Sequence, residues 1–232
     1  MSHIIEIKNL TKTFNLPRKN VEVIRDINLE IKEGDFALIY GPSGCGKTTL
    51  LNLILALETP TSGEIKIKSH ILNHFKPKER AAFRLKNFAC VFQSQIWLKS
   101  LNVLDNVALP LYLRGQDACY ARERAGTALA FAGVEKFSHS RPNELSSGEQ
   151  QRVGLARAII CDAPIIVADE PTGNLDSTAS NKVINILDTL NKRYKKTIIL
   201  VTHNQSYWEF GSQQIEMRDG QIYARSGKKP KS

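Results

Sequence analysis

The stretch Phe36-Ala37-Leu38-Ile39-Tyr40-Gly41-Pro42-Ser43-Gly44-Cys45-Gly46-Lys47-Thr48 decides the fold of this chain. Its first five residues form a continuous apolar run, which predicts a strand buried on both faces. A glycine-rich loop follows, and residues 48–57 then predict a helix. A loop that leads from a buried strand into a helix points free backbone N–H groups at an anion, and the helix dipole adds to that attraction.

The residue types in this loop suit the phosphates of a nucleotide. Glycine lets the main chain pass close to phosphate oxygens because it has no Cβ atom. Lys47 can reach the β and γ phosphates, and the hydroxyl of Thr48 can hold Mg²⁺. The predicted phosphate site consists of Gly41, Pro42, Ser43, Gly44, Cys45, Gly46, Lys47, Thr48 and Thr49.

A second buried run, residues 165–168, ends in Asp169 and Glu170. The carboxyl ends of strands are where α/β sheets bind ligands, so two carboxylates at this position suit a phosphoryl-transfer site. We expect Asp169 to contact Mg²⁺ through water. We expect Glu170 to act as the general base that polarises the attacking water.

Hydrophobic periodicity extends the prediction to the rest of the chain. Alternating apolar residues predict strands over residues 4–40 and 64–68. Residues 71–160 are rich in helix formers, most clearly at 78–86 and 118–132. After residue 164 the pattern predicts a helix over 177–193 and a strand over 197–202. We therefore expect an α/β fold.

The predicted organisation is a single domain over residues 1–232. In it, residues 1–70 and 161–232 form the core subdomain, and about residues 71–160 form an inserted helical subdomain. The chain has 232 residues, of which 42% are hydrophobic and 24% charged, and this composition fits one globular domain.

The formal charge is +9, because 32 Lys and Arg outnumber 23 Asp and Glu. This charge suits nucleic acid, anionic lipid or a nucleotide, and it is also typical of a generally basic solvated surface. Four scattered cysteines without a CxxC pair predict reduced thiols. Residues 1–6 lack a signal-peptide pattern, and the longest apolar stretch, residues 50–57, is too short to cross a bilayer. For a membrane process, we expect another chain to supply the membrane part.

Residues 145–150, Leu-Ser-Ser-Gly-Glu-Gln, complete a set of three motifs in a fixed order. Over essentially its whole length the chain resembles the ATP-binding subunit of ABC transporters, whose signature motif these residues match. The resemblance implies a P-loop NTPase of ABC type, with a RecA-like mixed sheet core, an N-terminal antiparallel β region and an inserted helical subdomain. It also implies that the Ser146 hydroxyl and the Gly148 N–H bind the γ-phosphate held by a second subunit. Ser147 stands where the family has glycine, a departure expected to weaken this clamping or alter its rate.

Four further residues match functional positions of that family. Gln93 matches the glutamine that senses Mg²⁺ and water and links them to the membrane subunit. Asp176 lies in the segment that crosses the dimer interface, and His203 matches the histidine that holds the γ-phosphate. Phe14 takes the place of the aromatic residue that stacks on adenine. A core role for Phe14 stays open as the alternative.

Three stretches narrow the resemblance, namely residues 106–111, 169–176 and 216–220. They are similar to the branch that contains the lipoprotein-releasing ATPase LolD, the macrolide-efflux protein MacB and the division protein FtsE, with LolD the best match. The resemblance implies an ATPase that drives a separate permease by ATP-dependent dimer closure, in lipoprotein release or a related MacB-like mechanotransmission. The alternatives are an FtsE-like cell-division ATPase and a soluble non-transport ABC ATPase that acts on nucleic acid.

The implied cofactors are ATP and Mg²⁺. The implied partners are a second copy of the chain and an integral membrane permease, and no nucleic acid is expected. The permease would place the chain at the cytoplasmic face of the inner membrane. Trp97, Leu98 and Leu101 are expected either to grip a coupling helix of that permease or to be plain core.

Overall fold

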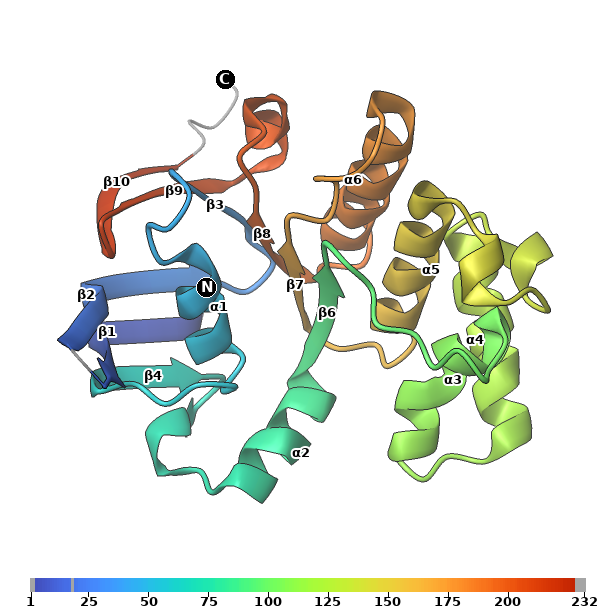
Figure 1. Cartoon of the computed structure of the whole chain (residues 1–232), viewed down its shortest axis with the longest axis horizontal. Coiled ribbons are helices and arrows are strands. Elements are labelled where there is room, and N and C mark those ends of the chain that lie inside the picture. The colour runs from blue at the N-terminus through green and yellow to red at the C-terminus, as the bar shows by residue number, and fades with distance from the viewer. Residues whose placement is uncertain (1–2, 18, 228–232) are drawn as a thin grey trace. The chain divides into compact units, whose positions relative to one another are not determined.

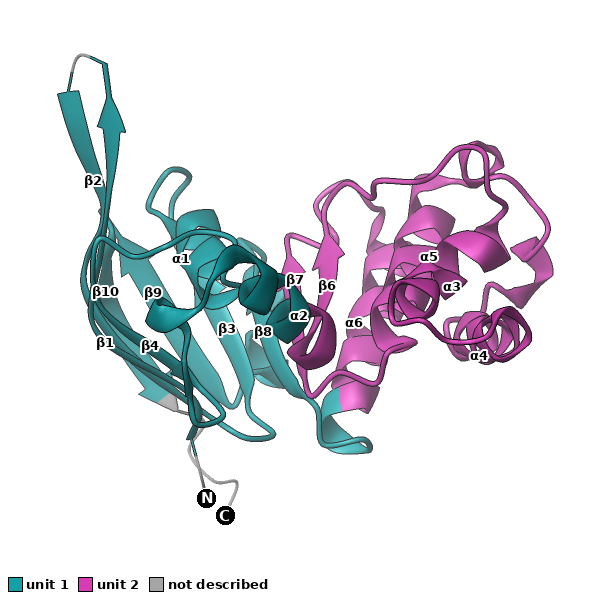
Figure 2. Cartoon of the chain, turned by 90° about the horizontal axis from the view of Figure 1, so that it is seen from below, with its two compact units in different colours: residues 1–84, 191–232 teal, residues 85–190 magenta. Residues whose placement is uncertain are grey.

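A computed structural model describes residues 3–17 and 19–227, and the chain divides into two compact units (Figures 1 and 2). Unit 1 comprises residues 1–84 and 191–232, and unit 2 comprises residues 85–190. Residues 1 and 2, the start of the segment that lacks a signal-peptide pattern, lie outside the described residues.

The N-terminal part of unit 1 is an antiparallel sheet with the strand order β2-β1-β4-β5. Its strands are β1 (His3–Leu16), β2 (Lys19–Lys32), β4 (Ser62–Ile67) and β5 (His70–Ile71). The alternation of Ile5 and Ile7 with polar neighbours buries one face of β1, because successive side chains point to opposite sides of a strand. The expected N-terminal antiparallel β region is therefore confirmed.

The second set of strands in unit 1 has the order β10-β9-β3-β8. Here β3 (Phe36–Tyr40) runs parallel to both β8 (Thr197–Val201) and β9 (Gln213–Arg218), and β10 (Gln221–Gly227) pairs antiparallel with β9. Four of the five residues of β3 are buried, as a continuous apolar run predicts for a strand covered on both faces. The strand pair β9 and β10 was not predicted from the sequence.

Helix α1 (Lys47–Ile54) follows β3 and the glycine-rich loop. It ends three residues before the predicted end at residue 57. The backbone turns at Ala56, whose φ is +52°, and the N–H groups of Leu57 and Glu58 both bond to the carbonyl of Asn52, at 2.8 and 3.2 Å. Such a turn satisfies carbonyls that the helix end leaves open. It leaves the Leu57 side chain 51% exposed.

Unit 2 holds a parallel pair of strands, β6 (Phe88–Phe92) and β7 (Ile165–Asp169). Its helices are α3 (Val103–Leu113), α4 (Ala118–Phe131) and α5 (Ser147–Ile159), with short 3-10 turns at Glu135–Phe137 and Pro142–Glu144. Helices α3, α4 and α5 share one apolar cluster that includes Val107, Leu129 and Val153. Strand β6 lies within the range whose composition predicted helix, because five residues are too few to show a period.

The two boundaries between the units fall within helices, namely α2 (Pro77–Asn87) and α6 (Ser177–Lys192). The remaining turns are Leu72–His74 and Gln205–Phe210. Among residues 3–17 and 19–227, no helix is long and apolar enough to span a bilayer.

Candidate functional site

The glycine-rich loop of unit 1 passes so close to β9 that glycine is required at its start. Gly41 has a φ of +152°, and a Cβ atom built there would lie 2.1 Å from the carbonyl oxygen of Met217. Gly46, with a φ of +102°, is the left-handed residue from which α1 begins. Both conformations are open to glycine because it has no side chain. The loop therefore forms a cradle that ends at a helix N-terminus, as an anion site needs.

The Lys47 side chain folds back over this cradle. Its ammonium donates hydrogen bonds to the carbonyls of Gly41 and Pro42, both at 2.9 Å, and lies 3.8 Å from Sγ of the buried Cys45. Phosphate oxygens would offer this ammonium stronger, charge-assisted bonds than the carbonyls do. The rest of the predicted phosphate site is exposed or partly exposed, namely Ser43, Gly44, Thr48 and Thr49.

Phe14 lies on β1 opposite Val21 and is partly buried. The ammonium of Lys12 stands 4.7 Å from the Phe14 ring centroid, in a cation–π contact, and is held there by Glu58 at 2.9 Å. The ring is thus supported by a fixed cation.

His203 lies two residues after the end of β8 and is exposed. The backbone around it is fixed by Thr202, whose N–H donates to the carbonyl of Ile39 at 3.1 Å and whose hydroxyl oxygen accepts from the N–H of Asn204 at 3.0 Å. Buried Thr202 thus fixes the backbone beside His203 at the end of β8.

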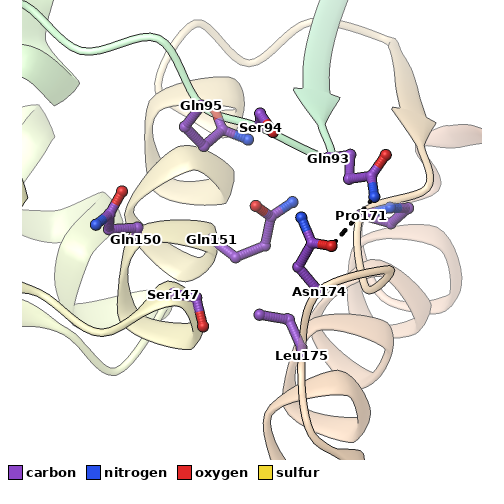
Figure 3. A pocket seen from close by; sticks show the side chains of 9 residues that line it. All are labelled: Gln93, Ser94, Gln95, Ser147, Gln150, Gln151, Pro171, Asn174 and Leu175. Atoms are coloured by element: carbon purple, nitrogen blue, oxygen red, sulfur yellow. Dashed lines mark hydrogen bonds between the residues drawn. The ribbon is translucent and has the colours of Figure 1, made fainter.

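In unit 2, the candidate residues Gln93 and Glu170 directly follow the paired ends of β6 and β7. Phe92 stands opposite Asp169 in the parallel register, so Gln93 and Glu170 are the next residues along their chains. Nε2 of Gln93 donates to Oδ1 of Asn174 at 3.4 Å, and Figure 3 shows the two side chains pointing toward each other.

Glu170 has a φ of +45°, in the left-handed region that residues other than glycine seldom occupy. This backbone conformation costs about 1–2 kcal/mol. The N–H of Gly173 donates to the Glu170 carbonyl at 3.1 Å and closes the turn. The turn thus fixes the backbone that carries the Glu170 side chain at the end of β7.

The signature residues form the start of α5. Ser146 is its N-cap, and the Glu149 carboxylate accepts from the Ser146 N–H at 2.9 Å and from the Ser146 hydroxyl at 2.7 Å. The hydrogen bond from Ser146 lowers the pKa of Glu149. Ser146 and Ser147 are exposed, and Gly148 is partly exposed. A Cβ atom at Gly148 would lie 3.0 Å from the Cβ atom of Ala179, which is a crowded contact. The N-terminus of α5 thus presents a hydroxyl and free N–H groups at the surface.

Asp176 is exposed and caps α6, since its carboxylate accepts from the N–H of Ala179 at 2.8 Å and its carbonyl from that of Ser180 at 2.9 Å.

A polar pocket of about 250 Å³ lies between α5 and the segments that follow β6 and β7 (Figure 3). Five of its nine lining residues carry side-chain amides. The lining residues are Gln93, Ser94, Gln95, Ser147, Gln150, Gln151, Pro171, Asn174 and Leu175. Sequence reasoning did not single out Gln95, because an isolated glutamine carries no motif. It included Gln150 in the signature motif but assigned no role to the side chain of Gln150 or Gln151.

The sequence profile of the ABC transporter family matches residues 24–173. The chain belongs to this family. The match spans the glycine cradle, the signature residues and the two carboxylates at the end of β7, so the predicted family and fold class are confirmed. The chain is an ABC-type ATPase subunit.

This ABC ATPase is similar to known proteins over nearly its full length. It is 43% identical to the uncharacterized ABC transporter ATP-binding protein MJ1508 of Methanocaldococcus jannaschii, with 94% of this chain and 97% of that protein covered. It is 40% identical to the lipoprotein-releasing system ATP-binding protein LolD of Syntrophus aciditrophicus, with 94% and 98% covered. It is 39% identical to the macrolide export protein MacB of Hyphomonas neptunium, of which it spans 35%. The predicted branch of the family is confirmed by these matches.

Among solved structures, the ABC ATPase is similar to the ATP-binding cassette MJ0796 in a dimeric post-hydrolysis state bound to ADP and Pi. The TM-score is 0.90 at 37% identity, with 96% of this chain and 98% of that chain covered.

The residues of the ABC ATPase also fit a nucleotide-bound Mg²⁺. No group of three or more His, Cys, Asp or Glu side chains in the described part of the chain could hold a metal ion. Mg²⁺ is commonly bound by one or two protein ligands together with phosphate oxygens and water. The Thr48 hydroxyl and the Asp169 carboxylate are oxygen groups of the kind that Mg²⁺ accepts, directly or through water.

Proposed function

We propose that two copies of this chain bind two molecules of MgATP at a shared interface. In this dimer, each ATP is held by the phosphate loop of one copy and by the start of α5 of the other. The observation that carries the proposal is that one chain has two accessible helix N-termini, at α1 and at α5, and a helix N-terminus is suited to bind an anion. Support also comes from MJ0796, a relative of similar fold that was solved as a dimer with ADP and Pi.

In this proposal ATP acts as a ligand that favours the closed dimer. ATP bridges two copies in the closed state and contacts one copy in the open state, so it shifts the equilibrium toward closure. Hydrolysis removes the bridging γ-phosphate and reopens the dimer. The work delivered to a partner is limited by the difference in ATP affinity between the two states.

The roles of the individual residues follow from their chemistry. Glu170 acts as the general base toward the attacking water, and His203 holds the γ-phosphate. Thr48, Gln93 and Asp169 are the residues that would hold Mg²⁺, which supplies charge neutralisation at the transferred phosphoryl group.

Binding of the nucleotide uses further residues of both copies. The N–H groups of residues 41–49 hold the phosphates, and Phe14 stacks on adenine with Lys12 behind its ring. Ser146 and Gly148 of the second copy bind the γ-phosphate. Asp176 contributes to the dimer interface from the start of α6.

The partner in this proposal is an integral membrane permease, which places the ATPase at the cytoplasmic face of the inner membrane. An apolar surface follows Gln93, where Ile96 is 86% exposed and Leu98 46% exposed. Trp97 packs instead against the apolar cluster of unit 2. We assign the permease contact to Ile96 and Leu98, because exposed apolar side chains in one short segment mark an interaction site. Similarity to LolD favours lipoprotein release as the process.

The test is affinity capture from membranes with the Glu170→Gln variant as bait, in the presence of ATP. The variant should retain a permease with membrane-spanning helices, and an Ile96→Asp, Leu98→Asp variant should lose it. Retention of nucleic acid or of a soluble protein in place of a permease would contradict the proposal. Steady ATP turnover by the purified wild-type chain should accompany this result and should disappear in Glu170→Gln.

A further inference from the structure

Residues 92–97, called here the Gln93 segment, are bonded to helix α5 within unit 2. At the start of the segment, Nε2 of the buried Gln151 donates to the carbonyl of Phe92 at 2.9 Å. This bond fixes the backbone immediately before Gln93. A buried amide that makes such a bond is costly to free, because its N–H would be left without a partner.

The end of the same segment is bonded to the signature residues. Nε1 of Trp97 donates to Oε1 of Gln150 at 3.0 Å, and Nε2 of Gln150 donates to the carbonyl of Leu145 at 3.0 Å. Gln150 therefore joins the indole of Trp97 to the residue that precedes Ser146. Both ends of the Gln93 segment are thus tied to the first turns of α5.

Arg157, near the C-terminal end of α5, holds the middle of the segment. Its guanidinium donates to Oε1 of Gln95 at 2.9 Å and to the carbonyl of Ile96 at 2.7 Å, and it stacks on the Trp97 ring at 4.4 Å. Nε2 of Gln95 in turn donates to the carbonyl of Phe92 at 2.8 Å. Burial lowers the pKa of the Arg157 guanidinium. One planar cation therefore fixes three successive residues at once.

A guanidinium is the group that suits this arrangement. Its fixed fork of N–H donors can serve an amide and a carbonyl while its flat face lies on an aromatic ring. A lysine ammonium can provide the positive charge but not the planar fork. The geometry thus depends on arginine and not on charge alone.

We propose that Arg157 is a positioning residue, which fixes the Gln93 segment to the signature helix so that Gln93 and Ser146 move as one body during the ATPase cycle. The proposal rests on the proposed function, because the proposed function gives Gln93 and Ser146 their roles in one catalytic cycle. In this proposal Arg157 acts through its contacts with Gln95, Ile96 and Trp97, and it does not touch ATP.

The first test uses Trp97 as a reporter. The chain has two tryptophans, so Trp208→Phe leaves Trp97 as the only one. In this background, acrylamide quenching of Trp97 should be low, both without nucleotide and with MgATP. Arg157→Leu should raise the quenching constant and lower the fluorescence anisotropy, because Trp97 loses its stacked partner. Arg157→Lys should lie between the two.

The second test is kinetic. Arg157→Leu should lower kcat by roughly tenfold to a hundredfold, since a displacement of about 1 Å can cost that much, while KM for ATP changes by less than about twofold. Arg152→Leu is the matched control. Arg152 lies on the same helix and donates to the carbonyl of Gly133 at 2.8 Å, away from the Gln93 segment. The Arg152→Leu variant should have a lower melting temperature, but kcat of its folded fraction and its Trp97 quenching should be unchanged.

Three outcomes would overturn the proposal. They are unchanged Trp97 quenching in Arg157→Leu, a fall in kcat no larger than that of Arg152→Leu, and a rise in KM that matches the fall in kcat. If Arg157→Leu does not fold, Arg157→Lys carries both tests and Trp97→Phe carries the kinetic one, and wild-type kinetics in both variants would refute the role. Wild-type protein that hydrolyses no ATP would count against the proposed function, while the quenching result would still test the contact.

Discussion

Gln93 and Asn174 are joined by a hydrogen bond of 3.4 Å between the segment that follows β6 and the turn that follows β7. Gln93 directly follows the carboxyl end of β6, and Asn174 lies in the turn beyond the carboxyl end of β7. The bond therefore lies at the edge where α/β sheets bind ligands. The Cβ position of Gly173 is 2.9 Å from Nε2 of Gln93, so a side chain at residue 173 would displace the glutamine. The turn after Glu170 and the Gln93 side chain therefore fit each other.

This relationship predicts the effect of Gln93→Leu. Leucine keeps the approximate size but loses both the bond to Asn174 and the proposed contact with Mg²⁺ and water. We expect kcat to fall by about tenfold to a hundredfold, with little change in the melting temperature, because residue 93 is exposed. Steady-state kinetics over a range of Mg²⁺ concentrations would measure it. Asn174→Ala, which removes only the bond between the two side chains, should have a smaller effect.

Lys47→Ala should weaken ATP binding with little effect on folding. The ammonium bonds to the loop itself, at Gly41, Pro42 and Cys45, and its proposed role is to bind phosphate. Loss of a charge-assisted hydrogen bond is worth about 1.5–3 kcal/mol, which corresponds to a Kd higher by roughly tenfold to 150-fold. Isothermal titration calorimetry with ATP would measure this. An unchanged Kd would rule Lys47 out of the phosphate site.

Ser146→Ala should reduce both stability and turnover. The N-cap contribution of Ser146 is about 1 kcal/mol, since alanine cannot accept the N–H of Glu149. The larger effect is expected on kcat, because the hydroxyl proposed to bind the γ-phosphate is gone. Ser147→Ala, at an exposed neighbouring position, is the control for stability and should differ from wild type by less than about 0.5 kcal/mol.

Asp105 should make unit 2 sensitive to acid. Its carboxylate accepts from Nε of Arg122 at 2.8 Å and from the hydroxyl of Tyr112 at 3.1 Å, and the Arg122 bond holds the pKa of Asp105 below its ordinary value. A pKa lower in the folded than in the unfolded state adds stability above the unfolded value of about 3.9, and this contribution is lost as the pH falls through the folded pKa.

Asp105→Asn should therefore cost about 1 kcal/mol at pH 7 and flatten the stability curve below about pH 5. Urea unfolding at a series of pH values would show the change. Glu123→Gln, an exposed change on α4, should follow the wild-type curve. An Asp105→Asn curve as steep as that of the wild type between pH 3 and 5 would refute the role of this carboxylate.

The sequence predicted local structure most strongly at positions where only one physical reason explains the residue type. Gly41 and Gly46 were identifiable because a phosphate loop needs backbone without Cβ atoms, and both have positive φ. Strand β3 was identifiable because an apolar run without period suits a strand buried on both faces.

Strands β6 and β9 show what sequence reasoning missed. Strand β6 has five residues within a stretch rich in helix formers, and β9 begins with a buried glutamine, Gln213, where the alternating pattern calls for an apolar residue. The contacts of Arg157 were also missed. An arginine on a helix is ordinarily solvated, and only the folded backbone brings it to Gln95 and Trp97.

The central claim, that two copies share ATP between the α1 and α5 helix starts, is tested most directly by the mass of the Glu170→Gln variant in solution. The variant keeps every proposed ATP contact but lacks the general base, so ATP should persist. Light scattering should give 26.0 kDa without nucleotide and twice that mass with saturating MgATP. The additional change Ser146→Ala should weaken the dimer. A Glu170→Gln protein that binds MgATP in calorimetry yet stays at the monomer mass would contradict the account.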